Sequence, residues 1–448
     1  MHHGIEQNVG LMTLLAKKPV FVVTLAVLFT TLFSWFQTNS WCIILLLICG
    51  LWVEGPVKAI RTAFTNKYFL AYFIYWLIQA AGLFYTHNPV KGQNLVAKDT
   101  TLVAIAFVLC GCRFADEKGY RSLITAYSLL VFASALYCLY RAEILYVRLH
   151  DSSVFFYHPL AAPLSQNAVF YSVYVLFAMQ FLLSPEGDPA IGLSAPVRKW
   201  CRILLVVFFL GMIVLLSSKL ILILALLMLV NFFGKRYYTT QNLKALVISG
   251  LAAICLVAGL FAIDNPVKQR FTKMVDGGIS VPKRDTINAA TAFDPLPLRI
   301  LEWHFAFEIL REHHAWLFGV SPGDSQDLLD QKYVDTHMWI GNPDDGPDRR
   351  IRGFLGYNFH DQYIETLVRS GFIGFASLML ILGLQIGIAL KWRTKEARFT
   401  VLTLILFFIP ESPLTMQHGV FLFCFFPLLL LYSRRKVPIM VVKQPDKS

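Results

Sequence analysis

Apolar runs that approach or reach the length needed to cross a lipid bilayer recur along almost the whole chain. Examples are residues 19–36, 203–218 and 245–263, none of which contains a charged side chain. A helix needs about 20 residues to cross a hydrocarbon core of about 30 Å, so such runs predict transmembrane helices. Of the 448 residues, 56% are hydrophobic and only 15% are charged, which is too apolar for a soluble domain of this size. The sequence therefore predicts an all-α polytopic membrane protein.

The number and direction of the spans follow from the alternation of apolar runs with polar connections. We expect about twelve spans, centred near residues 27, 47, 77, 106, 130, 175, 210, 227, 254, 381, 404 and 425. Every second connection is basic, and the positive-inside rule makes such connections cytoplasmic. Their basic residues are Lys17, Lys18, Lys58, Arg61, Lys67, Arg113, Lys118, Arg121, Arg198, Lys199, Arg202, Lys235, Arg236, Lys244, Lys391, Arg393, Lys395, Arg398, Arg434, Arg435 and Lys436. Both termini are therefore expected inside, and the net charge of +12 reports topology rather than a nucleic-acid partner.

One hydrophilic segment, residues 264–359, is large enough to fold over the membrane. It divides the chain into spans one to nine (1–263), a large outer loop (264–359), and spans ten to twelve with a cytoplasmic tail (360–448). Residues 297–319 of the loop are expected to form an amphipathic helix that lies on the bilayer or packs under the loop. None of the eight cysteines lies in this loop, so neither a disulfide framework nor a thiolate zinc site is expected there. The N-terminus lacks a signal-cleavage pattern, so we expect no processing.

The loop's position outside the membrane limits the chemistry available to an enzyme. ATP and nucleotide sugars are absent there, so a bond-forming reaction needs a substrate that arrives activated, and a lipid diphosphate meets that need. The departing diphosphate requires positive charge, which arginine provides best through its bidentate fork. A general base that works near neutral pH is most simply a histidine.

The stretch GYNFHDQYIETLVRSGFIGF, residues 356–375, contains such a histidine where the loop meets a span. Spacings of four, three and four residues place on one helical face His360, Ile364, Leu367 and Gly371. We expect His360 at the outer end of the span and Gly371 at a close contact with a neighbouring helix, a device that Gly383 and Gly387 repeat. The alternative is that His360 is a polar residue that anchors the span at the interface.

Two basic side chains are candidates to bind the diphosphate. Arg299 opens the loop helix, where its charge opposes the helix dipole, so a bound anion there would be stabilised by both groups. The alternative is a solvated arginine. Lys219 lies between spans seven and eight with almost no loop around it; it either serves a functional site or extends its amine to the headgroups.

Weaker signals lie elsewhere in the outer segments. Arg352 belongs to a basic patch that either binds anionic lipid or is a solvated loop. His158 and Gln166 follow each other in an outer connection and are candidates to line the same cavity. The acidic segment 342–348 lacks a calcium-loop pattern, and we expect no metal site.

Together these residues resemble the O-antigen ligase superfamily, which also contains O-antigen polymerases and some protein O-oligosaccharyltransferases. The resemblance covers residues 200–390. The ligases carry a histidine motif, H-[NSQ]-x-x-L-x6-G, and here it runs from His360 through Ile364 to Gly371. Asp361 departs from the motif; it is expected either to raise the basicity of the histidine or to point to solvent.

The resemblance extends to the two cations. Arg299 followed by Trp303, Gly319 and Gly323 is similar to the family's loop pattern, which implies that Arg299 contacts the diphosphate. A second family arginine follows a serine at the place of Lys219, where lysine keeps the charge but loses the fork. The expected topology also agrees with the family, and the resemblance implies the fold of the C-type membrane glycosyltransferases.

The function implied is transfer of a polyprenyl-diphosphate-linked glycan, such as one on undecaprenyl diphosphate, to a sugar hydroxyl of lipid A core. The reaction would take place at the periplasmic face of a bacterial inner membrane, in lipopolysaccharide biosynthesis. His360 would activate the acceptor while Arg299 and Lys219 stabilise the leaving group, with Gln362 and Trp303 nearby. The ligase resemblance implies inversion, independence of metal, and no cofactor.

Two other functions stay open. A polymerase would use a second lipid-linked repeat as acceptor, and it would need the same residues. A polysaccharide transporter is less favoured, because transporters concentrate ionisable residues and broken helices near the bilayer midplane, whereas the polar residues here gather in one outer loop.

Overall fold

A computed structural model describes residues 19–112, 117–184, 195–240, 286–341, 353–392 and 395–432, together with 268 and 272. All regular elements in these ranges are helices, and six are long and apolar enough to cross a membrane. They correspond to α2 (Phe36–Glu54), α4 (Lys67–Ala81), α5 (Pro89–Gly111), α6 (Glu117–Leu149), α9 (Ala195–Leu216) and α15 (Gln362–Trp392). A seventh is formed if α7 (Tyr157–Ala161) and α8 (Ala168–Leu183), bent by 78°, count as one span. The prediction of an all-α membrane protein is confirmed for this part of the chain.

The expected count of about twelve spans is not confirmed, because several expected spans are shorter helices. These are Pro19–Leu32, the Lys219–Phe232 part of α10 (Lys219–Thr240), α16 (Lys395–Phe407) and α17 (Gln417–Leu429). The span expected near residue 254 and both chain termini lie outside the described residues. These described stretches of 13 or 14 residues are shorter than a bilayer core, so their length alone does not make them spans.

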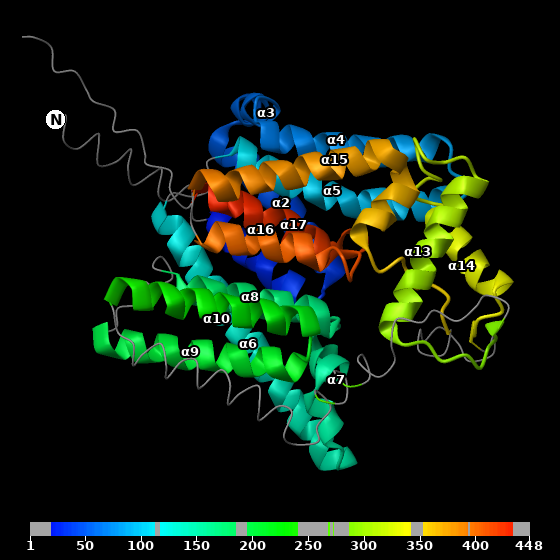
Figure 1. Cartoon of the computed structure of the whole chain (residues 1–448). Helices are drawn as coiled ribbons and strands as arrows, with labels where there is room; N and C mark the ends of the chain where they lie inside the picture. Colours follow the sequence, from blue (N-terminus) through cyan, green and yellow to red (C-terminus); the bar gives the residue numbers. More distant parts are fainter. Residues whose placement is uncertain are drawn as a thin grey trace, which may run out of the picture.

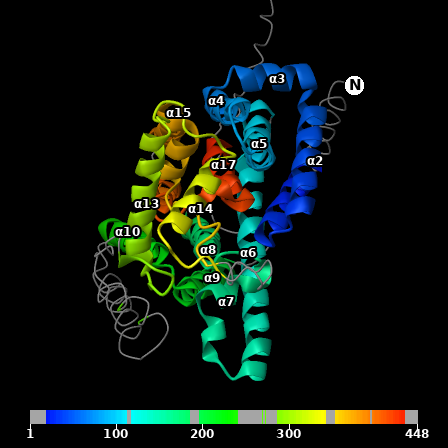
Figure 2. The ribbon, with the colours of Figure 1, turned by 90° about the vertical axis from the view of Figure 1, so that its right-hand side faces the viewer.

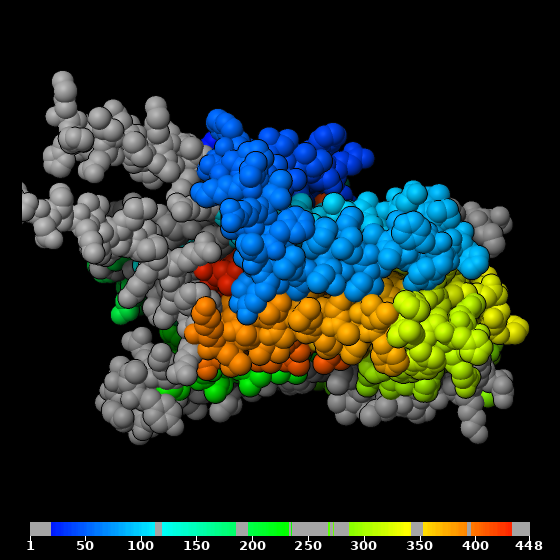
Figure 3. All heavy atoms as spheres, turned by 90° about the horizontal axis from the view of Figure 1, so that it is seen from above, coloured from blue at the N-terminus to red at the C-terminus, as the bar shows by residue number. Residues whose placement is uncertain are grey.

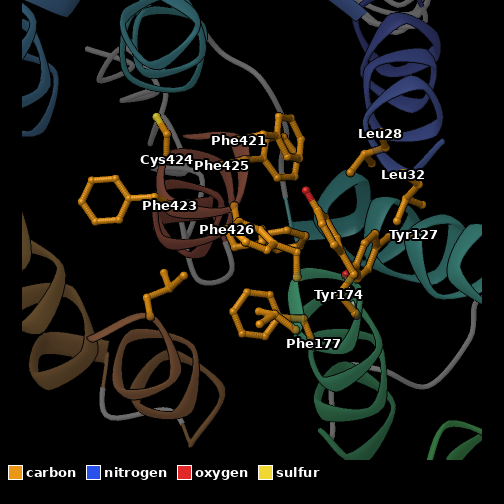
Figure 4. Packing of buried hydrophobic residues seen from close by; sticks show 14 of the residues in the cluster. Leu28, Leu32, Tyr127, Tyr174, Phe177, Phe421, Phe423, Cys424, Phe425 and Phe426 are labelled. Carbon is orange, nitrogen blue, oxygen red and sulfur yellow. Dashed lines mark hydrogen bonds between the residues drawn. The ribbon is translucent and has the colours of Figure 1, made fainter. Parts of the chain in front are cut away.

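Helix α17 forms the centre of the bundle, and all its residues from His418 to Leu429 are buried. It is surrounded by α5, α8, α15 and α16 (Figure 1). Its phenylalanines interleave with aromatic residues of α6 and α8, as Figure 4 shows for Tyr127, Tyr174 and Phe177. Some buried polar groups are paired within this core: the Tyr174 hydroxyl donates to the His418 carbonyl at 3.0 Å. Such pairing lowers the cost of burying a polar group where water is excluded. The two ring nitrogens of His418 have no hydrogen-bond partner among the described residues.

The loop folds into two helices, α13 (Pro295–Glu312) and α14 (Ser325–Asp335), at one end of the bundle (Figures 1 and 2). Their shared core contains Phe305, Ile309, Leu329 and Tyr333. The expected helix over 297–319 begins two residues earlier, with two prolines in its first turn, and ends at Glu312. It ends there because the chain turns at His314, whose φ is +50°. Helix α13 packs on α14 and α15.

Helix α15 is interrupted at Gly371, whose φ of 61° and ψ of −162° are not helical. A turn of the loop, residues 315–321, fills the break with hydrogen bonds. The amides of Val320 and Ser321 donate to the carbonyls of Val368 and Arg369 at 2.8 and 3.1 Å. The carbonyl of Trp316 accepts from the amide of Phe372 at 2.8 Å, and that of Leu317 from Ile373 at 3.3 Å. The break therefore joins the loop to the membrane helix through main-chain bonds.

Gly371 thus admits the backbone of this turn, and not a neighbouring helix as the sequence motif suggested. A Cβ at Gly371 would lie 2.3 Å from the carbonyl carbon of Leu317. Gly383 and Gly387 have nothing within 4 Å of a built Cβ, so the expectation that they repeat a close helix contact is wrong for the described residues.

We expect Gly371→Ala to destabilise the protein strongly. Glycine adopts the φ and ψ of this position readily, whereas for other residues they cost about 1–3 kcal/mol. The clash of the added Cβ with Leu317 adds to this cost. Gly387→Ala, in the same helix but in open space, should be neutral or stabilise by about 0.5–1 kcal/mol. Thermal unfolding of the purified protein in detergent measures both. Equal melting temperatures for the two variants would show that the break is not formed.

Candidate functional site

His360 lies where the loop joins α15, and its imidazole is held by a buried carboxylate. Its Nδ1 lies 2.9 Å from Oε2 of Glu302, a fully buried residue of α13. The Tyr333 hydroxyl donates to the other oxygen, Oε1, at 2.9 Å. With Nδ1–H donating to the carboxylate, Nε2 is left as the proton acceptor. This arrangement fixes the ring orientation that a general base requires.

The charges around His360 favour its protonated form. Burial lowers the pKa of His360, but the charge and hydrogen bond of Glu302, together with the charge of Glu411, outweigh burial and raise it above its ordinary value. The Arg299 guanidinium acts in the opposite direction. A raised pKa makes the imidazole a stronger base, and Glu302 stabilises the imidazolium that forms once it has accepted a proton.

The backbone at His360 is held in an unusual conformation. His360 has a φ of +47°, a left-handed value that non-glycine residues seldom adopt. The preceding residue, Phe359, is held at both its main-chain groups: Nε1 of Trp303 donates to the Phe359 carbonyl at 3.2 Å, and the Phe359 amide donates to Glu365 at 3.4 Å. Glu365 in turn pairs with Arg369 at 2.7 Å. Trp303 is thus a positioning residue for the histidine.

Arg299 provides positive charge beside this base. One of its terminal nitrogens lies 3.8 Å from Oε1 of Glu411, while its Nε is buried and has no hydrogen-bond partner among the described residues. The side chain is 24% exposed, so part of the guanidinium reaches an open surface. Burial raises the pKa of Glu411, whereas the charges of His360 and Arg299 lower it, and burial dominates. A guanidinium with an unsatisfied donor next to a proton acceptor can bind an anion and assist proton transfer.

Asp361 and Gln362 support the site without facing it. Asp361 is buried, so the expectation that it points to solvent is wrong. Its carboxylate accepts from the Ile364 amide at 2.9 Å and caps the start of α15. Burial raises the pKa of Asp361 to about 6, with the amide bonds acting against the rise. Gln362 is fully buried; its Oε1 accepts from the Leu414 amide at 2.7 Å, which ties the Glu411 segment to α15.

Lys219 lies at the same end of the bundle as His360. Gln180 of α8 bonds the Glu396 carbonyl at the start of α16, and Arg202 near the start of α9 bonds the Ser184 carbonyl that follows α8. Helices α9 and α16 therefore begin at the same end of the bundle and finish at the other end. His360 lies where α16 finishes, because the Gln362 amide donates to the carbonyl of Phe408. Lys219 follows the last residue of α9 and so lies at this end too. Lys219 is half-buried and is not among the side chains described above that hold His360 and Arg299.

His158 and Gln166 bond to the main chain of other parts of the bundle. His158 is exposed, and its Nδ1 accepts from the Ala168 amide at the start of α8 at 3.3 Å. Gln166 donates from Nε2 to the Thr31 carbonyl at 3.0 Å, so its amide ties the start of α8 to the end of the Pro19–Leu32 helix. Arg352 lies outside the described residues.

Two site residues, Glu302 and Glu411, were missed by the sequence reasoning. Glu302 follows Arg299 by three residues, a spacing that places both on one face of a helix. Glu411 lies in FIPESPLT, an acidic residue between two apolar runs. An ionisable group in such a place is costly and marks a functional candidate, so both signals were present.

The pair of His360 and Glu302, which we call the dyad, leads to a prediction about pH. A general base works only when neutral, so activity should fall as the pH drops through the raised pKa of His360. Glu302→Gln removes the charge that raises this pKa, and the acid limb of the pH–rate profile should therefore move to lower pH. The maximal rate should also fall, by at most the about 10²–10⁴-fold that general-base catalysis contributes. Glu312→Gln, an exposed carboxylate of the same helix, is the control, and an unmoved acid limb in Glu302→Gln would exclude the dyad.

Comparison with family models and with curated proteins gave no match to this chain.

Proposed function

We propose that this protein is a membrane glycosyltransferase of the O-antigen ligase type. It transfers a glycan from a polyprenyl diphosphate to a sugar hydroxyl, with lipid A core as the acceptor, at the periplasmic face of a bacterial inner membrane. The observation that carries the proposal is that a carboxylate-held histidine, His360, lies near a guanidinium, Arg299, whose Nε has no hydrogen-bond partner among the described residues. Arg299 belongs to the loop and His360 lies at its junction with α15, at one end of a membrane bundle, where a lipid donor and an aqueous acceptor can meet (Figure 1).

The transfer can be written with these residues. Nε2 of His360 takes the proton of the acceptor hydroxyl, and the oxygen forms a bond to the anomeric carbon of the donor sugar. The bond from that carbon to the diphosphate oxygen breaks, and the electron pair leaves with the polyprenyl diphosphate. Arg299 stabilises the growing charge on this leaving group, and Glu302 stabilises the imidazolium. Attack opposite the leaving group inverts the anomeric centre.

Transfer by purified protein in vesicles tests the proposal. The donor is an undecaprenyl-diphosphate-linked glycan, supplied with lipid A core in one reaction and with a second lipid-linked repeat in another. A single addition to the core is the expected product. Growth in product length with the second repeat would identify a polymerase instead, and no transfer to either acceptor would overturn the proposal.

A further inference from the structure

An aromatic face of the loop is exposed although it belongs to a well-packed turn. We use this name for Phe307 of α13, Trp316, Leu317 and Phe318 of the turn, and Phe372 and Ile373 of α15. Three of its rings form a stacked column: the Phe307 and Trp316 rings lie 6.2 Å apart, and those of Trp316 and Phe372 lie 5.9 Å apart. Phe318 is 59% exposed. A contiguous apolar surface of this kind marks an interaction site.

The carbonyls of this turn are hydrogen-bonded within the protein even though its side chains are exposed. Trp316 and Leu317 accept from the amides of Phe372 and Ile373, and Phe318 accepts from the Tyr85 hydroxyl at 2.6 Å. A turn that faces water has no need of such partners, because water satisfies exposed carbonyls. In a bilayer, non-helical backbone is tolerated only when its polar groups are satisfied internally.

The aromatic face is also continuous with the membrane surface of α15. Phe372 and Ile373 form the first turn of this span after its break, so the loop turn bonded to them lies at the same depth. In Figure 3 the yellow-green surface of the loop continues directly from the orange surface of α15. Residues 315–320 contain no charge, whereas the exposed residues just before them, from Arg311 to His314, are polar. Polar residues followed by uncharged, largely apolar residues are typical of a segment that passes from the headgroups into the acyl chains of a bilayer.

We propose that the turn formed by residues 315–318 inserts into the membrane leaflet on the loop side, with phospholipid as its partner. The stacked aromatic rings occupy the interface between headgroups and acyl chains, where such rings are favoured. Because Val320 and Ser321 bond to the short helix that follows His360, this insertion also fixes the height of His360 above the bilayer. The insertion does not depend on the reaction that the site performs.

Photochemical cross-linking tests the insertion. p-Benzoylphenylalanine replaces Phe318 in one variant and Val334 in another. Val334 is 42% exposed on α14 and lies outside the aromatic face, so it is a matched control. The full chain is placed in vesicles of phosphatidylethanolamine and phosphatidylglycerol and irradiated. We expect the mass of the protein to rise by one phospholipid when the label is at residue 318 and to stay unchanged when it is at residue 334.

Equal adducts at both positions, or none at residue 318, would overturn the insertion. A third variant with the label at Leu317 guards against local disturbance by the substitution at Phe318. It should give the phospholipid adduct even where the Phe318 variant folds poorly. Adducts absent at residue 317 in a protein with a normal melting temperature would contradict the proposal in the same way.

Discussion

Replacing His360 with asparagine should lower glycan transfer by about 10²–10⁴-fold, the usual contribution of a general base. Asparagine is the informative substitution because it tolerates left-handed backbone, and His360 has a φ of +47°. The variant should therefore keep the fold while losing the proton acceptor. Initial rates with saturating donor and acceptor measure the loss, and the melting temperature in detergent shows whether the protein is intact.

The control for this variant is His304→Asn, because His304 is an exposed histidine of α13. It should retain nearly full activity. If His360→Asn folds normally and transfers glycan at the rate of the unaltered protein, His360 is an interfacial anchor and not a base. An equal loss in both variants would indicate general damage to α13 and its surroundings.

The sequence predicted the membrane class, whereas its count of about twelve spans is not confirmed, and α17 shows the reason. Its residues are as apolar as those of a lipid-facing helix, yet they are buried on all sides by other helices. Composition records that a residue avoids water and does not distinguish protein from lipid around it. Helix length is therefore the better signal, and the 13 residues of α17 are too few for an ordinary span.

The residues of the candidate site differ in how far the sequence pointed to them. His360, Arg299 and Trp303 were selected because the family resemblance named them, and the structure places Trp303 against the carbonyl of Phe359 and the charge of Arg299 near His360. Glu302 escaped notice because α13 has apolar residues on every side, so no polar face draws attention to it. Its partner His360 lies 58 residues further along the chain, and only tertiary packing joins them. Gly371 was recognised as a contact point, but helical periodicity implied a helix as its partner, whereas the structure brings a turn there.

Replacing Arg299 with alanine should lower glycan transfer by about 10²–10³-fold, comparable to the loss of one donor from an oxyanion hole. The guanidinium stabilises charge that develops on the leaving diphosphate, so kcat should fall more than KM rises. Arg299→Lys keeps the charge but not the bidentate fork, so its activity should lie between that of Arg299→Ala and that of the unaltered protein. Arg311→Ala removes an exposed arginine of the same helix and should have little effect.

Glu411 makes it possible to separate catalysis from structure in this experiment. Removal of Arg299 leaves the buried carboxylate of Glu411 without its nearby guanidinium, and an unpaired buried charge can itself disturb a site. The double variant Arg299→Ala with Glu411→Gln removes both charges together. If the arginine only neutralises Glu411, the double variant should regain activity and melting temperature. If the arginine binds the diphosphate, the melting temperature should recover while transfer stays low, because the guanidinium that stabilises the charge of the leaving group is gone.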